Sequence, residues 1–193
     1  MPQLKFIFTG TPGAGKTTAI AAISDFPPVS TDAFVTDELI EVKEGTTVAM
    51  DFGELTLDSG ERIGLYGTPG QERFRHMWEI LINGGLGLII LVDNSRPDPI
   101  ADLRMYLDNF KQFILDTGAV IGITRSDLNP KIGLQNYQDF LEKEGWVLPI
   151  FEADARSKDD VLLLLDMLMA TVEMNNSMNQ DIYDEQHHEI HSF

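Results

Sequence analysis

The octapeptide Gly10-Thr11-Pro12-Gly13-Ala14-Gly15-Lys16-Thr17 matches the pattern GxxxxGK[ST] at every fixed position. The apolar stretch Leu4–Thr9 before it predicts a buried strand, and the residues from Lys16 onward predict a helix that ends before Pro27. Between a strand and a helix, such glycines let the backbone curl around an anion. The N–H groups of the first helical turn then point toward that anion. The octapeptide therefore predicts a phosphate loop for a nucleoside triphosphate, without specifying the base.

The residues of this loop have separate expected tasks. We expect Lys16 to bridge the β- and γ-phosphates and Thr17 to offer its hydroxyl to Mg²⁺. Pro12 has no N–H, so it shapes the loop without binding phosphate. The alternative is a glycine-rich turn without a ligand, which the full match and its position between strand and helix disfavour. The nucleotide-binding residues expected in this region are Gly10, Gly13, Ala14, Gly15, Lys16, Thr17 and Thr18.

The remaining apolar patterns predict an alternation of strands and helices. Leu86–Val92 is a continuous apolar run typical of a central parallel strand, and Asp58-Ser59-Gly60 predicts the turn of a hairpin. The other predicted strands are Thr47–Leu57, Arg62–Tyr66, Ala119–Thr124 and Trp146–Phe151, and the other predicted helices are Ile100–Leu115, Leu134–Glu144 and Val161–Val172. This order predicts a three-layer α/β P-loop fold: a mostly parallel six-stranded sheet, one antiparallel edge strand, and helices on both faces.

The length of 193 residues fits one domain, which we place at residues 1–174. A change to polar composition after Glu173 predicts a mobile C-terminal tail at residues 175–193. Between Asp25 and Gly45 the sequence is mixed and polar, and predicts a long loop.

Charge and cysteine content restrict the class of protein. The net charge of −17 repels nucleic-acid phosphates and anionic lipids, and the absence of cysteine excludes disulfides and thiolate metal sites. No apolar run reaches the ~20 residues of a membrane-spanning helix, and no secretory signal or lipidation box is visible. We therefore expect a cytoplasmic protein without membrane insertion and without a nucleic-acid partner.

A second motif follows the third predicted strand. The segment Tyr66-Gly67-Thr68-Pro69-Gly70-Gln71-Glu72-Arg73-Phe74 resembles the DxxGQE segment of Ras-like GTPases. That resemblance implies that the N–H of Gly70 senses the γ-phosphate and that Gln71 positions the attacking water. It also implies that Lys16, Gly70 and Gln71 carry catalysis, by positioning and charge neutralisation.

One residue departs from the Ras-like pattern. Gly67 stands where the family has an aspartate that holds a Mg²⁺ water. The same gap occurs in the bacterial MglA polarity GTPases, which the chain resembles from Leu4 to about Val172, including the pair Asp51-Phe52. We expect Asp51 to supply part of the missing charge beside the magnesium. The alternative is a strand aspartate that caps a neighbouring loop.

The resemblance also implies a switch threonine that contacts Mg²⁺ in the triphosphate state. Thr47 matches it, and Thr46, Thr31 and Thr36 are alternatives. Thr17 and Thr47 are thus the expected metal ligands.

A catalytic arginine is missing from the expected place. MglA proteins have an arginine just before the switch threonine, where this chain has Thr46. Arg73, Arg75 or a partner could supply that charge, which is worth ~10³–10⁵ in rate. Slow intrinsic hydrolysis is therefore expected.

Two further segments resemble the base-reading parts of Ras-like proteins. Thr124-Arg125-Ser126-Asp127 stands at the place of NKxD, and Asp154-Ala155-Arg156 at the place of Ser-Ala-Lys. The carboxylate of Asp127 can accept N1–H and N2–H₂ of guanine, whereas adenine has no donor at either place. We expect Arg125 to cover the base and the Ala155 N–H to bind O6, while Thr124 lacks the amide that ties this loop to the phosphate loop. An ordinary strand-to-helix turn is the alternative.

Together these features favour a switch that binds GTP or GDP with Mg²⁺ and hydrolyses GTP. MglA-related proteins are often associated with Roadblock/LC7 proteins, so the resemblance implies such a regulatory partner. A nucleotide-binding scaffold with little hydrolysis is an alternative, because Gly67, Thr46 and Thr124 all depart from the catalytic pattern. An ATP-binding P-loop protein is a further alternative; a metabolic kinase would need an arginine-rich lid and an acceptor pocket, and the sequence shows neither.

Overall fold

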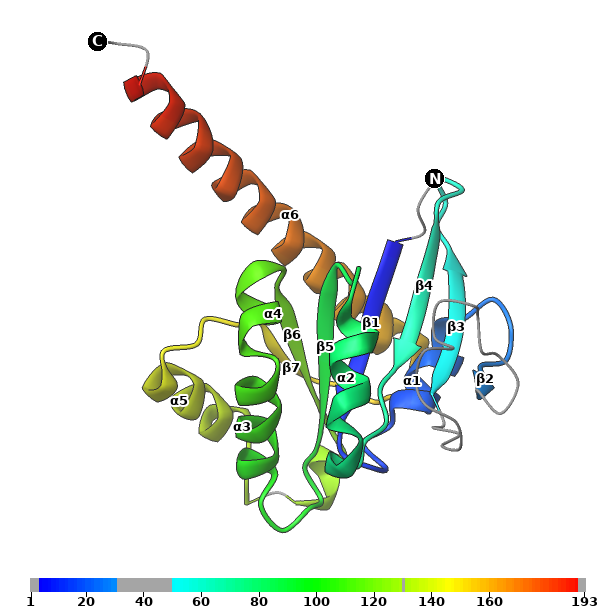
Figure 1. Ribbon diagram of the computed structural model, residues 1–193. Helices are drawn as coiled ribbons and strands as arrows, with labels where there is room; N and C mark the ends of the chain where they lie inside the picture. The colour runs from blue at the N-terminus through cyan, green and yellow to red at the C-terminus, as the bar shows by residue number, and fades with distance from the viewer. Residues whose placement is uncertain (1–3, 31–49, 130, 191–193) are drawn as a thin grey trace.

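A computed structural model describes residues 4–30, 50–129 and 131–190, and for residues 30 and 178–190 it describes only the course of the backbone. Within these residues, strands and helices alternate along the chain (Figure 1). The strands are β1 (Leu4–Gly10), β2 (Val29–Ser30), β3 (Asp51–Thr56), β4 (Arg62–Gly67), β5 (Gly87–Asp93), β6 (Ala119–Thr124) and β7 (Ile150–Glu152). The helices are α1 (Lys16–Ile23), α2 (Arg75–Ile82), α3 (Pro99–Asn109), α4 (Lys111–Asp116), α5 (Leu134–Glu144) and α6 (Lys158–Ile190).

The strands form one sheet in the order β2-β3-β4-β1-β5-β6-β7. The pairs from β4 to β7 are parallel, whereas β3 pairs antiparallel with β4 and β2 antiparallel with β3. The predicted fold class is therefore confirmed, and the two-residue β2 extends the antiparallel edge beyond the expected strands. In this arrangement β1, β4, β5 and β6 end at the same edge of the sheet, where ligands bind in open α/β folds.

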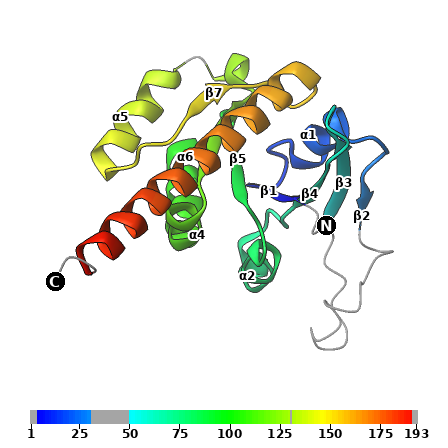
Figure 2. The same cartoon turned by 90° about the horizontal axis from the view of Figure 1, so that it is seen from above.

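Helices α1 and α6 cover one face of the sheet and α2, α3 and α4 the other (Figure 2). Alternation along β1 divides the core accordingly, since Phe6 and Phe8 face α1 and α6 while Ile7 faces the opposite layer. The predicted helical face of Leu103 and Leu107 is buried in that second layer. A buried apolar core thus lies on each face of the sheet, and it holds in place the strand ends that carry the loops described below.

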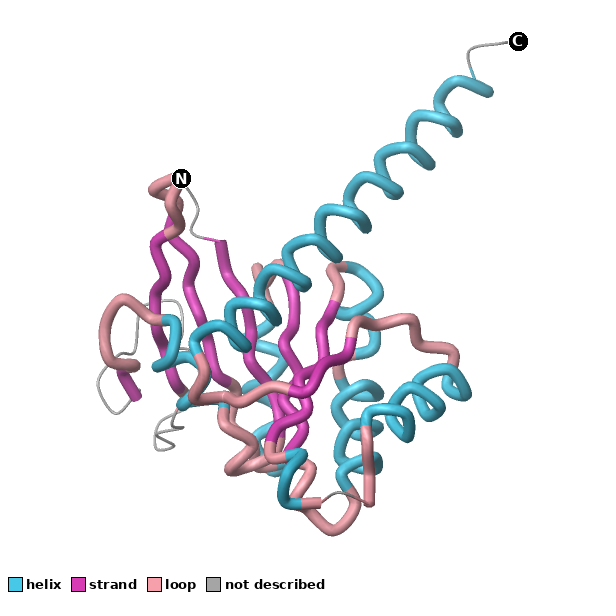
Figure 3. Tube along the Cα trace, turned by 180° about the vertical axis from the view of Figure 1, so that it is seen from behind, coloured by secondary structure: helices cyan, strands magenta, loops and turns pink. Residues whose placement is uncertain are grey.

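Three expected boundaries differ from the structure. The helix expected at Ile100–Leu115 is divided into α3 and α4 at Phe110, and the strand expected at Trp146–Phe151 is limited to β7. Helix α6 runs on to Ile190 and projects beyond the sheet (Figure 3), so residues 175–190 are helical. The division into a domain at residues 1–174 and a mobile tail at residues 175–193 stays a prediction.

Candidate functional site

The phosphate loop joins β1 to α1 as its sequence predicts. Gly13 and Gly15 have φ of 82° and 101°, a backbone region that favours glycine. Lys16 is only 8% exposed, and its ammonium donates to the carbonyls of Gly10 at 2.8 Å and Thr11 at 2.9 Å. Burial lowers the pKa of Lys16 to about 8, and the negative charge of Asp51 partly offsets that effect. The loop therefore holds a buried cation whose charge depends on its surroundings.

Beside Lys16, a hydroxyl and a carboxylate from distant parts of the chain meet. Thr17 Oγ1 donates to Asp51 Oδ2 at 2.5 Å. Asp51 stands directly opposite Gly67 in the antiparallel ladder of β3 and β4. A Cβ atom on Gly67 would lie 3.2 Å from the Asp51 Cβ and 3.3 Å from its Oδ2. The carboxylate of β3 thus occupies the space beside the residue at which the Ras-like pattern has its aspartate.

The segment after β4 returns to the phosphate loop. A Cβ atom on Gly70 would lie 2.5 Å from the Pro12 nitrogen and 2.8 Å from Lys16 Nζ, so only glycine fits there. Gln71 follows immediately and is exposed at the start of a 3-10 turn. The structure thus places Gly70 against the loop and leaves the Gln71 side chain in solvent.

The two arginines expected as substitute cations lie further along this segment. Arg75 forms an ion pair with Glu72, and the Arg73 guanidinium lies 4.9 Å from the centre of the Phe74 ring. Both side chains are exposed. Among the apolar residues of this segment and of α2, Trp78 is buried, while Phe74 and Met77 are half-buried.

A cavity of about 640 Å³ adjoins the phosphate loop and brings the two predicted base-reading segments together. Its lining comes from the phosphate loop and α1, from the β6 end, and from the β7–α6 connection. The predicted site residues in that lining are Ala14, Gly15, Thr18, Thr124, Arg125, Asp127, Asp154, Ala155 and Arg156.

Thr124 connects this cavity to the phosphate loop, which corrects one expectation. The Thr124 hydroxyl is buried and donates to the Ala14 carbonyl at 3.1 Å, with a second acceptor in the Val92 carbonyl at 3.2 Å. A hydroxyl therefore makes the tie that we expected to be lost with the amide. Ala155 strengthens the same junction, because a Cβ atom on Gly15 would lie 2.8 Å from the Ala155 Cβ.

Charged side chains around the cavity form pairs with their neighbours. Arg125 has a φ of 56° and donates to Asp93 Oδ2 at 2.5 Å. Arg156 donates to the Asp154 carboxylate at 2.7 Å, and this hydrogen bond lowers the pKa of Asp154 to about 2. The Asp127 side chain is exposed at the cavity.

Sequence reasoning missed three residues, Asp93, Asn94 and Tyr137, that support the loop after β6. Asp93 is 4% exposed and anchors Arg125, and Asn94 is fully buried. Asn94 donates to the carbonyls of Asn129 and Ile132, and accepts from the Tyr137 hydroxyl at 2.6 Å. Asp93 and Asn94 directly follow the continuous apolar run Leu86–Val92, and polar residues at a strand's carboxyl end were the available signal.

Thr47, the expected switch threonine, lies outside the described residues, as do its alternatives Thr46, Thr31 and Thr36. Among the residues that the structure does describe, no group of three or more acidic or histidine side chains gathers as a metal cluster. Over the same residues, no helix combines the length and apolarity required to cross a bilayer.

Comparison with known proteins places this architecture in a family. The family described as "Conserved hypothetical ATP binding protein" matches residues 8–182. The chain belongs to this family. The match of the conserved hypothetical ATP-binding family begins in β1 and extends into α6, so it includes the phosphate loop, the Gly70 segment and the residues that line the cavity.

Distant relatives are found among Ras-related proteins. Rab-27A of Rattus norvegicus is 25% identical over 179 residues, which cover 88% of this chain and 80% of the relative. RabC of Dictyostelium discoideum is 23% identical over 183 residues, or 90% of this chain and 86% of the relative. RABE1e of Arabidopsis thaliana is 28% identical over 117 residues, which cover 59% of this chain and 48% of the relative. These relatives support a P-loop protein of the small GTPase kind.

Proposed function

We propose that the chain binds GTP and GDP with Mg²⁺ and hydrolyses GTP slowly, as a molecular switch. The observation that carries this proposal is the junction at which Thr124 and Ala155 contact the phosphate loop. It brings the cavity that Thr124, Asp127 and Ala155 line beside the phosphate loop, which supports a site for one nucleotide. The proposed contacts to the phosphates come from the loop residues Gly10, Gly13, Ala14, Gly15, Lys16, Thr17 and Thr18.

Asp127 is the proposed reader of guanine. Its exposed carboxylate lies at the cavity that Arg125 and Ala155 also line. A carboxylate pairs with the two donors of the guanine edge and would remain unpaired against adenine. The family description names ATP, so adenine is the rival base.

The residues present fit a magnesium ion. Mg²⁺ prefers hard oxygen donors, and the Thr17 hydroxyl and the Asp51 carboxylate lie side by side next to the phosphate loop. When bound, the ion would neutralise phosphate charge. Thr17 and Thr47 are the proposed direct ligands, and Asp51 provides the negative charge that Gly67 lacks.

Hydrolysis is proposed to depend on three residues of this chain. Lys16 neutralises charge on the phosphates, the Gly70 N–H faces the terminal phosphate, and Gln71 orients the attacking water. No arginine is placed on the phosphates by the described residues, so we propose slow turnover that a partner accelerates. A Roadblock/LC7-type protein is the proposed partner, by resemblance to the MglA group.

Base-resolved nucleotide binding tests the proposal. Protein freed of ligand is melted with GDP, GTP, ADP or ATP, each with and without Mg²⁺. A nucleotide at a hundred times its Kd stabilises by ~2.7 kcal/mol, or about 5–10 °C for a chain of this size. Guanine nucleotides should give this shift and adenine nucleotides a much smaller one. The reverse order would overturn the assignment of Asp127.

Single-turnover measurements then separate a switch from a scaffold. Bound GTP should convert slowly to GDP, and faster with a Roadblock/LC7-type protein. Intact GTP binding without conversion in either condition would show a scaffold.

A further inference from the structure

Two buried aromatic side chains hold the backbone of the segment that contacts the phosphate loop. Trp78 Nε1 on α2 donates to the Pro69 carbonyl at 2.8 Å, and the Tyr106 hydroxyl on α3 donates to the Gly70 carbonyl at 3.2 Å. Trp78 is 2% exposed and Tyr106 is 1% exposed. Two consecutive carbonyls are therefore bonded to side chains of two different helices.

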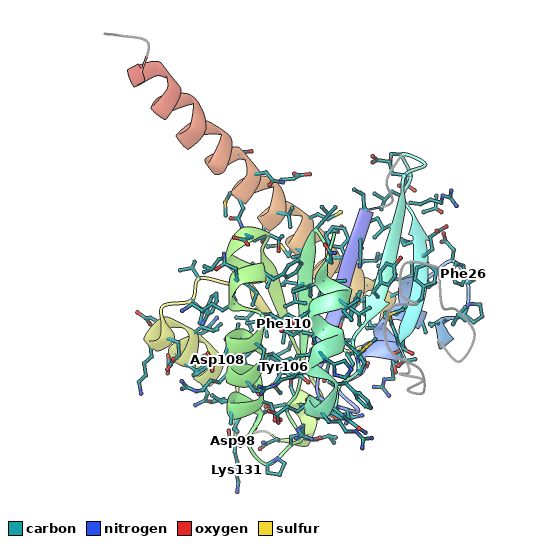
Figure 4. All side chains as sticks on the ribbon, in the orientation of Figure 1. Phe26, Asp98, Tyr106, Asp108, Phe110 and Lys131 are labelled. Carbon is teal, nitrogen blue, oxygen red and sulfur yellow. The ribbon has the colours of Figure 1, made fainter. Side chains whose placement is uncertain are left out.

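The two donors belong to one aromatic cluster. Figure 4 labels Tyr106 on α3 and Phe110 at the break between α3 and α4. The Trp78 ring centre lies 5.3 Å from both of these rings, and the Tyr106 and Phe110 rings lie 6.4 Å apart. Burial raises the pKa of Tyr106, so its hydroxyl keeps the proton that it donates. Donors that are buried among packed rings cannot hydrogen-bond to water instead. The two hydrogen bonds to the Pro69 and Gly70 carbonyls therefore keep one orientation.

The hydrogen bond from Trp78 to the Pro69 carbonyl also determines how the Gly70 N–H is oriented. The Pro69 carbonyl and the Gly70 N–H belong to the same peptide unit, and the described residues contain no cis peptide bond. In a trans peptide the C=O and the N–H point in opposite directions. Because Trp78 holds the carbonyl, the Gly70 N–H points away from α2. Gly70 itself borders Pro12 and Lys16, where a Cβ atom would lie 2.5 Å and 2.8 Å from their nitrogens.

We propose that Trp78 is a positioning residue, whose indole N–H sets the direction in which Gly70 presents its N–H to a terminal phosphate. Tyr106 steadies the next carbonyl from α3. The inference rests on the proposed nucleotide binding and adds to it: discrimination of triphosphate from diphosphate depends on a side chain that does not itself touch the nucleotide. Movement of Gly70 on loss of the terminal phosphate would also change the surroundings of the indole.

The first test removes the donor and keeps an aromatic ring. Trp78→Phe is compared with the intact protein and with Trp146→Phe, a control at the chain's other tryptophan, on the α5–β7 connection. Affinities for GDP and for the β,γ-imido analogue of GTP are measured with Mg²⁺. One lost hydrogen bond should reduce the preference for the triphosphate analogue by about two- to tenfold, with GDP affinity unchanged. The control should change neither affinity.

A second variant separates this role from packing. Replacement of Trp78 by 3-benzothienylalanine preserves the shape of the indole and removes only the N–H donor. It should reproduce the reduced preference with a smaller loss of melting temperature than Trp78→Phe, because the packing of the ring is kept. If this variant lost affinity for GDP and for the GTP analogue equally, or kept its preference for the GTP analogue, the inference would be overturned. The proposed nucleotide binding would still stand. Failure of the unmodified protein to bind any nucleotide would instead refute the proposed function.

A spectroscopic measurement provides an independent readout. In Trp146→Phe protein the only remaining tryptophan is Trp78. Its emission should differ between the GDP complex and the imido-GTP complex. Identical spectra would show that the indole does not follow Gly70, and would contradict the inference.

Discussion

Moving one carboxylate across the sheet is a demanding test of the magnesium side of the site. Asp51→Ala should reduce Mg²⁺-dependent nucleotide affinity by about ten- to a hundredfold, the usual effect of losing a group that supports a metal ligand. Gly67→Asp on the unmodified chain adds a second carboxylate whose Cβ lies 3.3 Å from Asp51 Oδ2. Two such charges about 4 Å apart repel by roughly 4 kcal/mol at an effective dielectric constant of 20. This single variant should therefore lose stability or affinity.

The double variant Asp51→Ala with Gly67→Asp should recover what the single variants lose. Removing the Asp51 carboxylate clears the 3.3 Å contact and leaves two contacts of 3.2 Å to adjust, one to the flexible end of Ile20 and one to the Cβ atom that alanine keeps at residue 51. We expect affinity to return to within about threefold of the original. Compared with the loss in Asp51→Ala this is a recovery of about 0.7–2 kcal/mol, and any affinity that Gly67→Asp loses on its own adds to the coupling.

The assay is displacement of a fluorescent nucleotide across a Mg²⁺ titration, with EDTA as the metal-free reference and melting curves to report stability. Glu54→Ala is the matched control, because Glu54 is an acid of the same strand that pairs with Arg62. It should leave the Mg²⁺ dependence unchanged. A double variant that binds no better than Asp51→Ala would refute the reasoning, since Asp51 would then act in some way other than by its charge beside residue 67.

Three further results are expected. Because burial lowers the pKa of Lys16 to about 8 and bound phosphate raises it, triphosphate affinity should be constant below pH 7 and fall roughly tenfold by pH 9. Over pH 8–10.5 the ligand-free protein should gain stability, because the pKa of Lys16 in the folded state lies below its unfolded value of 10.5. Binding calorimetry checks the affinity and melting curves check the stability. An affinity that stays constant up to pH 9.5 would contradict the lowered pKa of Lys16. Thr124→Val should weaken GDP and GTP alike by about two- to tenfold, since it breaks the bond to the Ala14 carbonyl, and a selective effect on one nucleotide would count against this role. Gln71→Ala should slow single-turnover hydrolysis about tenfold or more with binding unchanged, and an unaltered rate would show that Gln71 does not position the water.

Local signals explain the parts that the sequence predicts well. The phosphate loop is encoded by eight adjacent residues, and the glycines at positions 13 and 15 adopt the positive φ that the motif needs. The continuous apolar run of β5 identifies the centre of the sheet for a similar reason, because burial on both faces leaves a pattern within one segment.

Contacts between distant segments explain the rest. That Asp51 lies opposite Gly67 depends on the register of β3 and β4, which no single segment specifies. The helix breaks at Phe110 without interrupting the apolar periodicity, so the sequence pattern does not show the break. In the structure the Phe110 ring stacks on Trp78 at this point. Likewise α6 continues past residue 175 although its composition becomes polar, and Asn175 donates to the Thr117 carbonyl at 3.2 Å.

The close approach of Gly70 to Pro12 has a consequence for the history of the family. The atoms in the way belong to the main chain, because a single added carbon at residue 70 would lie 2.5 Å from the Pro12 nitrogen and 2.8 Å from the Thr11 carbonyl carbon. No side chain at residue 12 removes these atoms, so a change at residue 70 cannot be compensated there. An alignment of relatives should therefore show glycine at residue 70 whatever residue stands at 12, and a harmful change at residue 70 should find no genetic suppressor at residue 12.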